Sequence, residues 1–212
     1  MYSGTVLASR IATLLWVIAA GVSCRTGGVE SGPRVVQPGA PGESSHVVSA
    51  GQPSRIPYTE ADVHFMQGMI VHHAQALEMT ALLRDRTSRA DMKMLALRID
   101  VSQADEIKMM RRWLEVRGQT APSEHAHDGM PMPGMLTPDQ MARLAATTGA
   151  EFDRLFLEGM IQHHGGALVM VAELFATPAA GQDAEIFDFA SHVDADQRME
   201  IDRMRGMLRA KE

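Results

Sequence analysis

Apolar residues in the second quarter of the chain recur every three or four positions, which is the spacing of amphipathic helices. Thr59, with Asp62 three residues later, supplies the cap of a first helix that continues to about Arg86. A second apolar stripe starts after Ser88 and stops at Gly118, because glycine commonly terminates helices. The pattern predicts two long helices joined by a short turn.

The C-terminal half repeats this organisation after a proline-rich loop at 119–136. Thr137 followed by Pro138 is a cap with proline at the first helical position, and it predicts a short helix. Two further long helices are expected at about 150–176 and 182–209.

The predicted long helices form two copies of one unit. The pattern Asp-x-x-Phe-x-x-Gly-Met-Ile-x-His-His-x-x-Ala-Leu-x-Met begins at Asp62 and again at Asp153, 91 positions later. The pattern Gln-x-x-Glu-Ile-x-x-Met-x-x-x-Leu begins at Gln103 and again at Gln197, 94 positions later. Two hairpins with one apolar face each bury that face best against each other. The sequence therefore predicts an all-α four-helix bundle over residues 58–210, built from two duplicated helical hairpins.

The N-terminal segment has the features of an export signal over residues 1–24. Arg10 precedes an apolar run, Ile11 to Ala20, which is shorter than the ~20 residues of a membrane span. The only cysteine, Cys24, follows directly and resembles the lipidated cysteine of a bacterial lipobox, although Gly21 occupies the usual leucine position. We expect a lipid anchor at Cys24. Cleaved secretion without lipid and an uncleaved anchor are the alternatives, and all three place the bundle outside the cytoplasm, either attached to the membrane or in the periplasm.

Residues 25–57 are rich in Gly, Pro, Ser and Val without a sustained period, which predicts a disordered tether. The net charge of -6 comes with scattered Lys and Arg and no basic stripe. Nucleic acid is therefore not an expected partner.

The repeated helices carry an unusual set of side chains. The chain has 17 Met but only two Trp and two Tyr. Met69, His72 and Met79 are three or seven residues apart and share one helix face, and His73 lies four residues after Met69. The second copy repeats the set as Met160, His163, His164 and Met170. Thioethers and imidazoles together form a ligand set suited to copper.

A purely structural role is the alternative for these side chains. Methionine fills irregular core gaps, and buried histidines satisfy their ring nitrogens by hydrogen bonds. Glu106 and Glu200, at matching positions, either face the histidines and orient their rings or lie on a solvated flank. Gly165-Gly166, inside the third long helix, indicates either a close packing approach or a ligand against bare backbone.

The loop holds a second concentration of candidate ligands. It contains a His-x-His pair followed by three methionines at short spacing: His125, His127, Met130, Met132 and Met135. Such a segment can wrap a copper ion, or it is a linker that happens to be rich in methionine.

Motifs of common enzymes are missing. The predicted long helices carry no Glu-x-x-His pair for a di-iron site, and the sequence has no Gly-rich phosphate loop, no HExxH and no Gly-x-Ser-x-Gly elbow. The sequence favours a non-enzymatic role.

The doubled histidine motif, each copy followed by the Gln-Glu-Ile-Met-Leu pattern, resembles the bacterial family called domain of unknown function 305. The resemblance covers roughly residues 58–208 and implies a ferritin-like bundle in an exported protein. A few relatives are known as extracytoplasmic copper-binding proteins that use His and Met ligands. Gly165-Gly166 and the lipobox are not part of the family pattern. The matching positions here are Met69, His72, His73, Met79, Met160, His163, His164 and Met170.

The hypothesis is an exported protein that sequesters copper, as Cu(I) or Cu(II), or hands it to a copper-exporting or copper-accepting protein. One rival is a metal-dependent oxidase. The other is a structural helical lipoprotein that binds no metal.

Overall fold

The computed structural model describes residues 35–37, 46–48, 57–123 and 132–210. The chain divides into two units, Met1–Pro53 and Ser54–Glu212. In the first unit, β1 (Val35–Gln37) and β2 (His46–Val48) pair antiparallel, within the segment predicted as a tether. The predicted signal segment and Cys24 lie outside the described residues.

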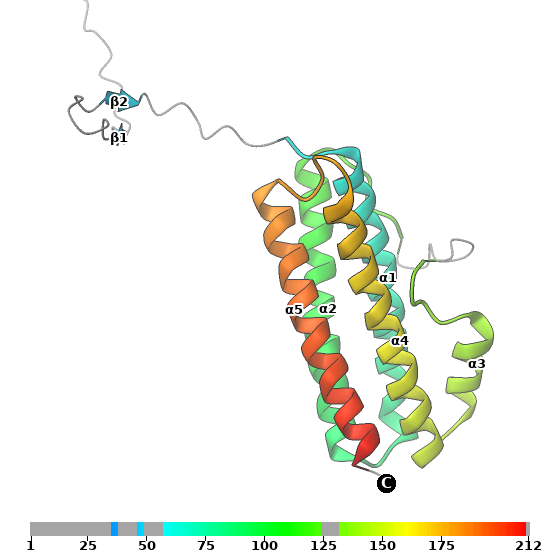
Figure 1. Ribbon diagram of the computed structural model, residues 1–212. Helices are drawn as coiled ribbons and strands as arrows, with labels where there is room; N and C mark the ends of the chain where they lie inside the picture. Colours follow the sequence, from blue (N-terminus) through cyan, green and yellow to red (C-terminus); the bar gives the residue numbers. More distant parts are fainter. Residues whose placement is uncertain (1–34, 38–45, 49–56, 124–131, 211–212) are drawn as a thin grey trace, which may run out of the picture. The chain divides into compact units, whose positions relative to one another are not determined.

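The second unit is helical. Four long helices pack side by side, and the short α3 lies against α4 (Figure 1). Their bounds are Glu60–Arg86 for α1, Ala90–Val116 for α2, Pro138–Ala146 for α3, Gly149–Ala176 for α4 and Ala184–Arg209 for α5. The predicted all-α four-helix bundle is confirmed.

The helix ends follow the capping signals with one exception. Thr59 and Asp62 form a reciprocal capping box at α1, and Gly118 follows α2 with a φ of 66°. Ser88 was expected to open α2, but the N-cap position belongs to Arg89, whose side chain makes no capping hydrogen bond. The Arg89 guanidinium instead pairs with Asp91 in the first turn.

The two hairpins, α1 with α2 and α4 with α5, meet mainly through α1 and α4. A Cβ built on Gly68 of α1 would lie 3.3 Å from the Cε of Met170, and one built on Gly159 of α4 would lie 3.4 Å from the Cε of Met79. These contacts are equivalent under the repeat. Helices α1 and α4 therefore run antiparallel and exchange matching surfaces.

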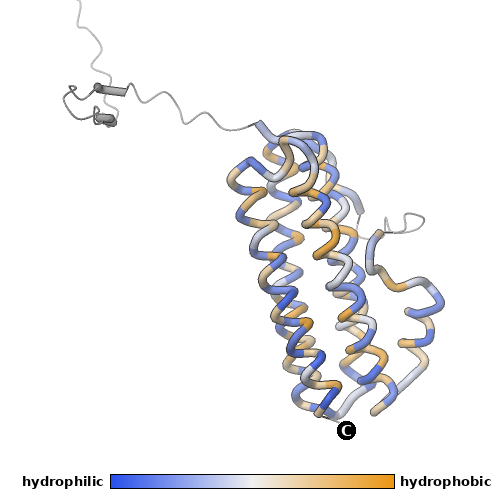
Figure 2. Tube along the Cα trace, viewed as in Figure 1, coloured by the Kyte–Doolittle hydropathy of each residue, from blue (hydrophilic) through white to orange (hydrophobic). Residues whose placement is uncertain are grey.

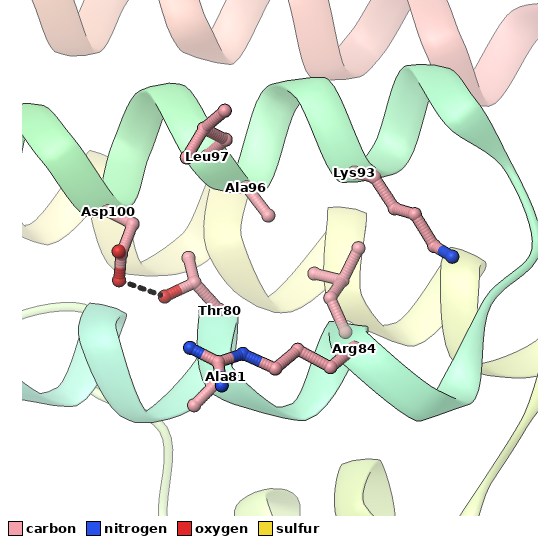
Figure 3. A pocket seen from close by; sticks show the side chains of 8 residues that line it. Thr80, Ala81, Arg84, Lys93, Ala96, Leu97 and Asp100 are labelled. Carbon is pink, nitrogen blue, oxygen red and sulfur yellow. Dashed lines mark hydrogen bonds between the residues drawn. The ribbon is translucent and has the colours of Figure 1, made fainter.

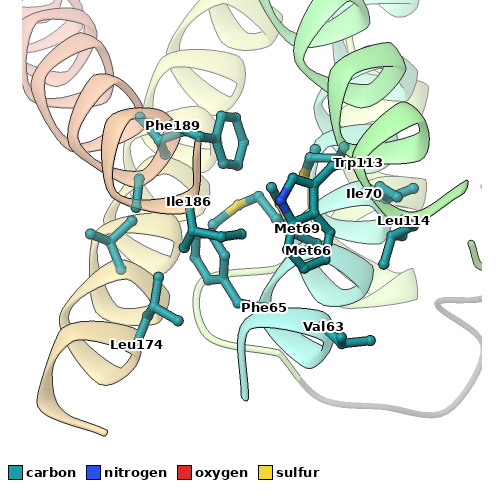
Figure 4. Packing of buried hydrophobic residues seen from close by; sticks show 14 of the residues in the cluster. Val63, Phe65, Met66, Met69, Ile70, Trp113, Leu114, Leu174, Ile186 and Phe189 are labelled. Atoms are coloured by element: carbon teal, nitrogen blue, oxygen red, sulfur yellow. The ribbon is translucent and has the colours of Figure 1, made fainter. Parts of the chain in front are cut away.

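Hydrophobic and hydrophilic positions are interspersed along each long helix (Figure 2). The buried apolar side chains form two clusters. The first cluster lies near the start of α1, where Phe65 and Met69 meet Trp113 and Phe189 (Figure 4). The second surrounds Phe156 near the other end of the bundle.

The segments that join the two clusters carry buried polar residues. These residues are His72, His73, Gln75, Gln103, His163, His164, Gln197 and Glu200. Helix packing therefore places the repeated polar positions of all four long helices in the interior. Within the described ranges, none of the helices combines the length and the apolar character that a bilayer crossing requires.

Candidate metal centre

The four repeated histidines lie together inside the bundle. His72, His73, His163 and His164 have no exposed surface. The ring centroids of His72 and His163 are 3.9 Å apart, and each ring lies just over 6 Å from that of its chain neighbour. The paired imidazoles of the two repeats thus converge instead of pointing to opposite exteriors.

Two of these rings are oriented by backbone carbonyls. The Nε2 of His163 donates a hydrogen bond to the carbonyl oxygen of His72 over 2.9 Å. The Nε2 of His72 donates to the carbonyl oxygen of Pro133 over 3.0 Å. Because a carbonyl oxygen only accepts, each ring carries its proton on Nε2.

The other two rings are oriented by carboxylates on the second helix of each hairpin. The Nε2 of His73 lies 2.6 Å from Oε2 of Glu106, and that of His164 lies 2.7 Å from Oε2 of Glu200. Ser102 donates to the other oxygen of Glu106 over 3.3 Å. Of the two alternatives left open for these glutamates, the structure shows the one in which they face the histidines.

All four rings keep their second nitrogen without a hydrogen-bond partner. The Nδ1 atoms of His72, His73, His163 and His164 are buried and unbonded. In a neutral ring whose Nε2 donates to a carbonyl oxygen, as in His72 and His163, the lone pair is on Nδ1, which is the state that a metal-binding imidazole needs. Each ring therefore has one nitrogen engaged by an oxygen and a second, buried nitrogen without a hydrogen-bond partner.

Burial keeps the central pair of rings neutral. Desolvation, followed by the neighbouring His73, lowers the pKa of His72 to about 3. Desolvation, followed by His72, lowers the pKa of His163 well below its ordinary value. At neutral pH the Nδ1 lone pairs of these rings are not blocked by protons.

The imidazoles do not form a complete site of nitrogen and oxygen ligands. Within the part of the chain that the structure describes, no three His, Cys, Asp or Glu side chains are arranged to hold a metal ion. Any ion held here would need further donors, and thioethers are the donors that the surrounding helices offer.

The four buried histidines are called the histidine layer below. The predicted methionine ligands lie on both sides of this layer. Met69 belongs to the first apolar cluster, and Met170 packs at its edge. Met79 and Met160 belong to the second cluster. Each end thus pairs a methionine of one repeat with a methionine of the other, because α1 and α4 run antiparallel.

A strap of residues Met132–Leu136 crosses α1 and α4 beside the histidines. Gln75 holds it at both amide atoms, donating to the carbonyl oxygen of Leu136 over 2.9 Å and accepting from its N–H over 2.7 Å. A Cβ on Gly166 would lie 1.9 Å from the carbonyl oxygen of Pro133, so the strap fits only because position 166 is glycine. Gly165, in contrast, has nothing within 4 Å.

The roles of Gln75 and Pro133 were missed from the sequence. One signal was available, because Gln75 and Gly166 are equivalent under the repeat and yet differ. The strap explains both residues: one position binds it, and the other makes room for it.

The loop predicted to bind copper is only partly described. His125, His127 and Met130 lie outside the described residues. Met132 and Met135 are half-buried in the strap. The Sδ of Met132 would lie 3.7 Å from a Cβ on Gly68, so this end of the loop reaches the bundle.

A different hollow, of about 380 Å³, lies between α1 and α2 (Figure 3). Thr80, Arg84, Lys93 and Asp100 are among its lining residues, and Thr80 donates to Asp100 over 3.3 Å. Among the described residues, no His or Met lines this hollow, so it offers none of the donor types of the four histidines and their neighbouring methionines.

Comparison with solved structures identifies close relatives of the bundle. A fragment from Deinococcus radiodurans is 32% identical over 72% of this chain and 97% of its own, with a TM-score of 0.64. A candidate secreted protein from Streptomyces coelicolor is 31% identical over 71% of this chain and 93% of its own, with a TM-score of 0.63.

CopM, solved in a Cu(I)-bound form, is 25% identical over 73% of this chain and 98% of its own, with a TM-score of 0.57. CopM has also been solved with Cu(II) and with silver. No curated protein matches the sequence. The family described as domain of unknown function (DUF305) matches residues 62–208, and this chain belongs to it.

Proposed function

We propose that this protein binds copper outside the cytoplasm and either sequesters it or passes it on. The observation that carries the proposal is the set of four buried Nδ1 atoms, each on a ring whose Nε2 is already engaged by an oxygen. Held in this way, the rings keep one tautomer and present lone pairs toward a cation.

The donor types favour copper over zinc. Structural zinc sites use four Cys, His or carboxylate ligands, and no three such side chains in the described residues have a metal-binding arrangement. Thioethers stabilise Cu(I), and imidazole accepts either oxidation state. Met69 and Met160, three residues before His72 and His163, are the nearest thioethers along each helix.

The relationship to CopM supports the same metal. CopM shares the fold and takes up Cu(I), Cu(II) and silver, which are the ions that a mixed His–Met ligand set prefers. A relative of this kind at 25% identity supports the class of ligand and leaves the individual ligands as a proposal.

The N-terminal sequence supports a location outside the cytoplasm. A signal segment over 1–24 with lipidation at Cys24 would hold the bundle at the outer face of the membrane, while cleavage without lipid would release it to the periplasm or beyond. From either place, the protein would give copper to an exporting or accepting protein.

A competition titration tests the proposal. Purified protein is titrated with Cu(I) against a chromogenic chelator, alongside a variant in which His72, His73, His163 and His164 are all replaced by Gln. We expect this variant to lose tight binding. His192→Gln, at an exposed site on α5, is the matched control and should bind like the wild type.

Retention of copper by the fourfold variant would mean that the histidines are structural. A further variant replaces His125, His127 and Met130 by Gln, Gln and Leu. If it loses the copper binding that remains, that binding belongs to the loop, and if it keeps that binding, the loop is excluded. Steady-state oxygen consumption by the copper-loaded protein would support the oxidase instead.

A further inference from the structure

A hollow of about 610 Å³ opens beside α1, next to the histidine layer. Its lining comprises His64, Gln67, Gly68 and Val71 of α1, Thr120 and Pro122 of the segment after α2, and Met132 of the strap. Val71 immediately precedes His72, and Met132 immediately precedes Pro133, whose carbonyl accepts from His72. The lining residues therefore include the chain neighbours of His72 and of its acceptor, Pro133.

Three residues of α1 form a row that runs from the exposed His64 to the buried His72. His64, Gly68 and His72 are four residues apart and so lie in one row on α1. The His64 side chain is exposed and lies 3.8 Å from the Glu60 carboxylate, whereas His72 is fully buried. Between them, Gly68 has no side chain and leaves a notch in the helix surface.

Two thioethers flank that notch. A Cβ on Gly68 would lie 3.7 Å from the Sδ of Met132 and 3.3 Å from the Cε of Met170. One methionine comes from the strap and the other from α4. Met132 thus presents its sulfur to the notch and Met170 its terminal methyl group, while the imidazole of His64 lines the same hollow.

The second repeat provides an internal comparison. Leu155, Glu158, Gly159 and Gln162 are the positions equivalent to those lining the first hollow, and they line a smaller one of about 230 Å³. There a Cβ on Gly159 would lie 3.0 Å from Leu136, and the residues lining this hollow include neither His nor Met. The second copy keeps the methionine contact, because a Cβ on Gly159 would lie 3.4 Å from the Cε of Met79, but it has Leu155 in place of His64 and Leu136 where the first copy has Met132.

We infer that the hollow beside Gly68 is a transfer site through which a soft monovalent cation such as Cu(I) reaches the buried imidazoles. This inference rests on the proposed copper-binding function. The buried histidines have no exposed surface, so an ion needs a path to them. Thioethers along that path bind and release the ion without the free-energy cost of desolvation that charged oxygen ligands impose.

The test compares rates with affinities. Cu(I) is presented anaerobically as a complex with a chromogenic chelator, and both its transfer to the protein and its return to excess chelator are followed by stopped-flow absorbance. Gly68→Leu fills the notch, and His64→Leu copies the second repeat at the mouth. Gly206→Leu, at a helical glycine with nothing within 4 Å, and Met199→Leu, at an exposed methionine, are the controls.

We expect Gly68→Leu and His64→Leu to slow loading and release together, several-fold, and to leave the equilibrium affinity unchanged. The two controls should keep wild-type rates. Thermal unfolding of each apo-protein verifies that the variants fold. Met132→Leu, which conserves volume but removes the sulfur, should also slow loading.

Unchanged loading rates in both Gly68→Leu and His64→Leu would overturn the transfer site while leaving copper binding intact. A loss of affinity that accounts for the slower loading would also overturn it, because the hollow would then be part of the final site. Absence of Cu(I) binding by the wild type would instead overturn the proposed function.

Discussion

The rings of His72 and His163 lie with centroids 3.9 Å apart, although the two residues are 91 positions apart in the chain. The Nε2 of His163 also donates to the backbone carbonyl of His72, so the two repeats are joined at their equivalent residues. Neither ring has exposed surface. Protonation of either ring in the folded state would bury a charge beside its partner, and this has a measurable effect on stability.

The metal-free protein should lose stability in mild acid. Folding lowers the pKa of His72 from 6.5 to about 3 and that of His163 to well below 6.5. Below pH 6.5, and above the lowered pKa of each ring, the unfolded chain therefore binds protons that the folded chain does not. Stability therefore decreases as the pH drops below 6.5, by up to ~1.4 kcal/mol per pH unit for each ring, and these two rings have no effect above that pH. Urea unfolding at a series of pH values measures the slope.

A double variant, His72→Gln with His163→Gln, is the control for that slope. It removes both titrating groups from the central pair, so its stability should depend less on pH between 6.5 and 4 than that of the wild type does. An equal slope in the variant would show that other groups cause the acid sensitivity.

The glutamates that hold the outer rings should govern metal affinity. Glu106→Gln and Glu200→Gln remove the charge from the acceptors of His73 and His164, which weakens the orientation of both rings. Loss of such supporting partners typically lowers metal affinity by ~10–100-fold, and we expect a Cu(I) competition titration to give a decrease in that range for the double variant. Glu115→Gln, at an exposed position of α2, should leave the affinity unchanged. Wild-type affinity in the double variant would contradict the proposed role of the imidazoles.

Adjacent glycines of α4 should respond to alanine with opposite signs. Gly165 has nothing within 4 Å, so Gly165→Ala gains the helix preference of alanine and should stabilise the fold by ~0.5–1 kcal/mol. Gly166→Ala places a Cβ 1.9 Å from a backbone oxygen of Pro133, and the strap must move. We expect Gly166→Ala to be destabilising in urea unfolding despite the same gain in helix preference. Stabilisation by both substitutions would mean that the strap does not pack on α4 as described.

Most of the bundle could be predicted from the sequence because its signals are local and duplicated. The Thr59–Asp62 capping box, the stop at Gly118 and the two copies of the helical pattern each specify structure within a few residues. The start of α2 was placed at Ser88 because serine is a good cap, but the observed cap, Arg89, has no such signal.

The candidate site was only partly predictable. The repeat accounts for the convergence of the histidine pairs, since equivalent residues of two packed hairpins meet near their common axis. The separation of Met69 from Met79 did not follow from a shared helix face, because residues ten apart lie about 15 Å apart along the axis. The strap could not be predicted at all, since the path of a loop depends on side chains such as Gln75 that contact it only in the folded protein.

Buried glutamines of the same layer should also respond in opposite directions. Gln103 and Gln197 are buried, and neither atom of either side-chain amide has a hydrogen-bond partner, whereas both amide atoms of Gln75 bind Leu136. Replacement by Met keeps the length of the side chain and removes the polar atoms. Gln75→Met leaves a backbone N–H and a carbonyl without partners, so it should cost ~1–3 kcal/mol, whereas Gln103→Met and Gln197→Met relieve unpaired amides and should be neutral or stabilising. Urea unfolding of the three apo-proteins measures these differences. If Gln103→Met or Gln197→Met loses as much stability as Gln75→Met, then ordered water or another group satisfies these amides.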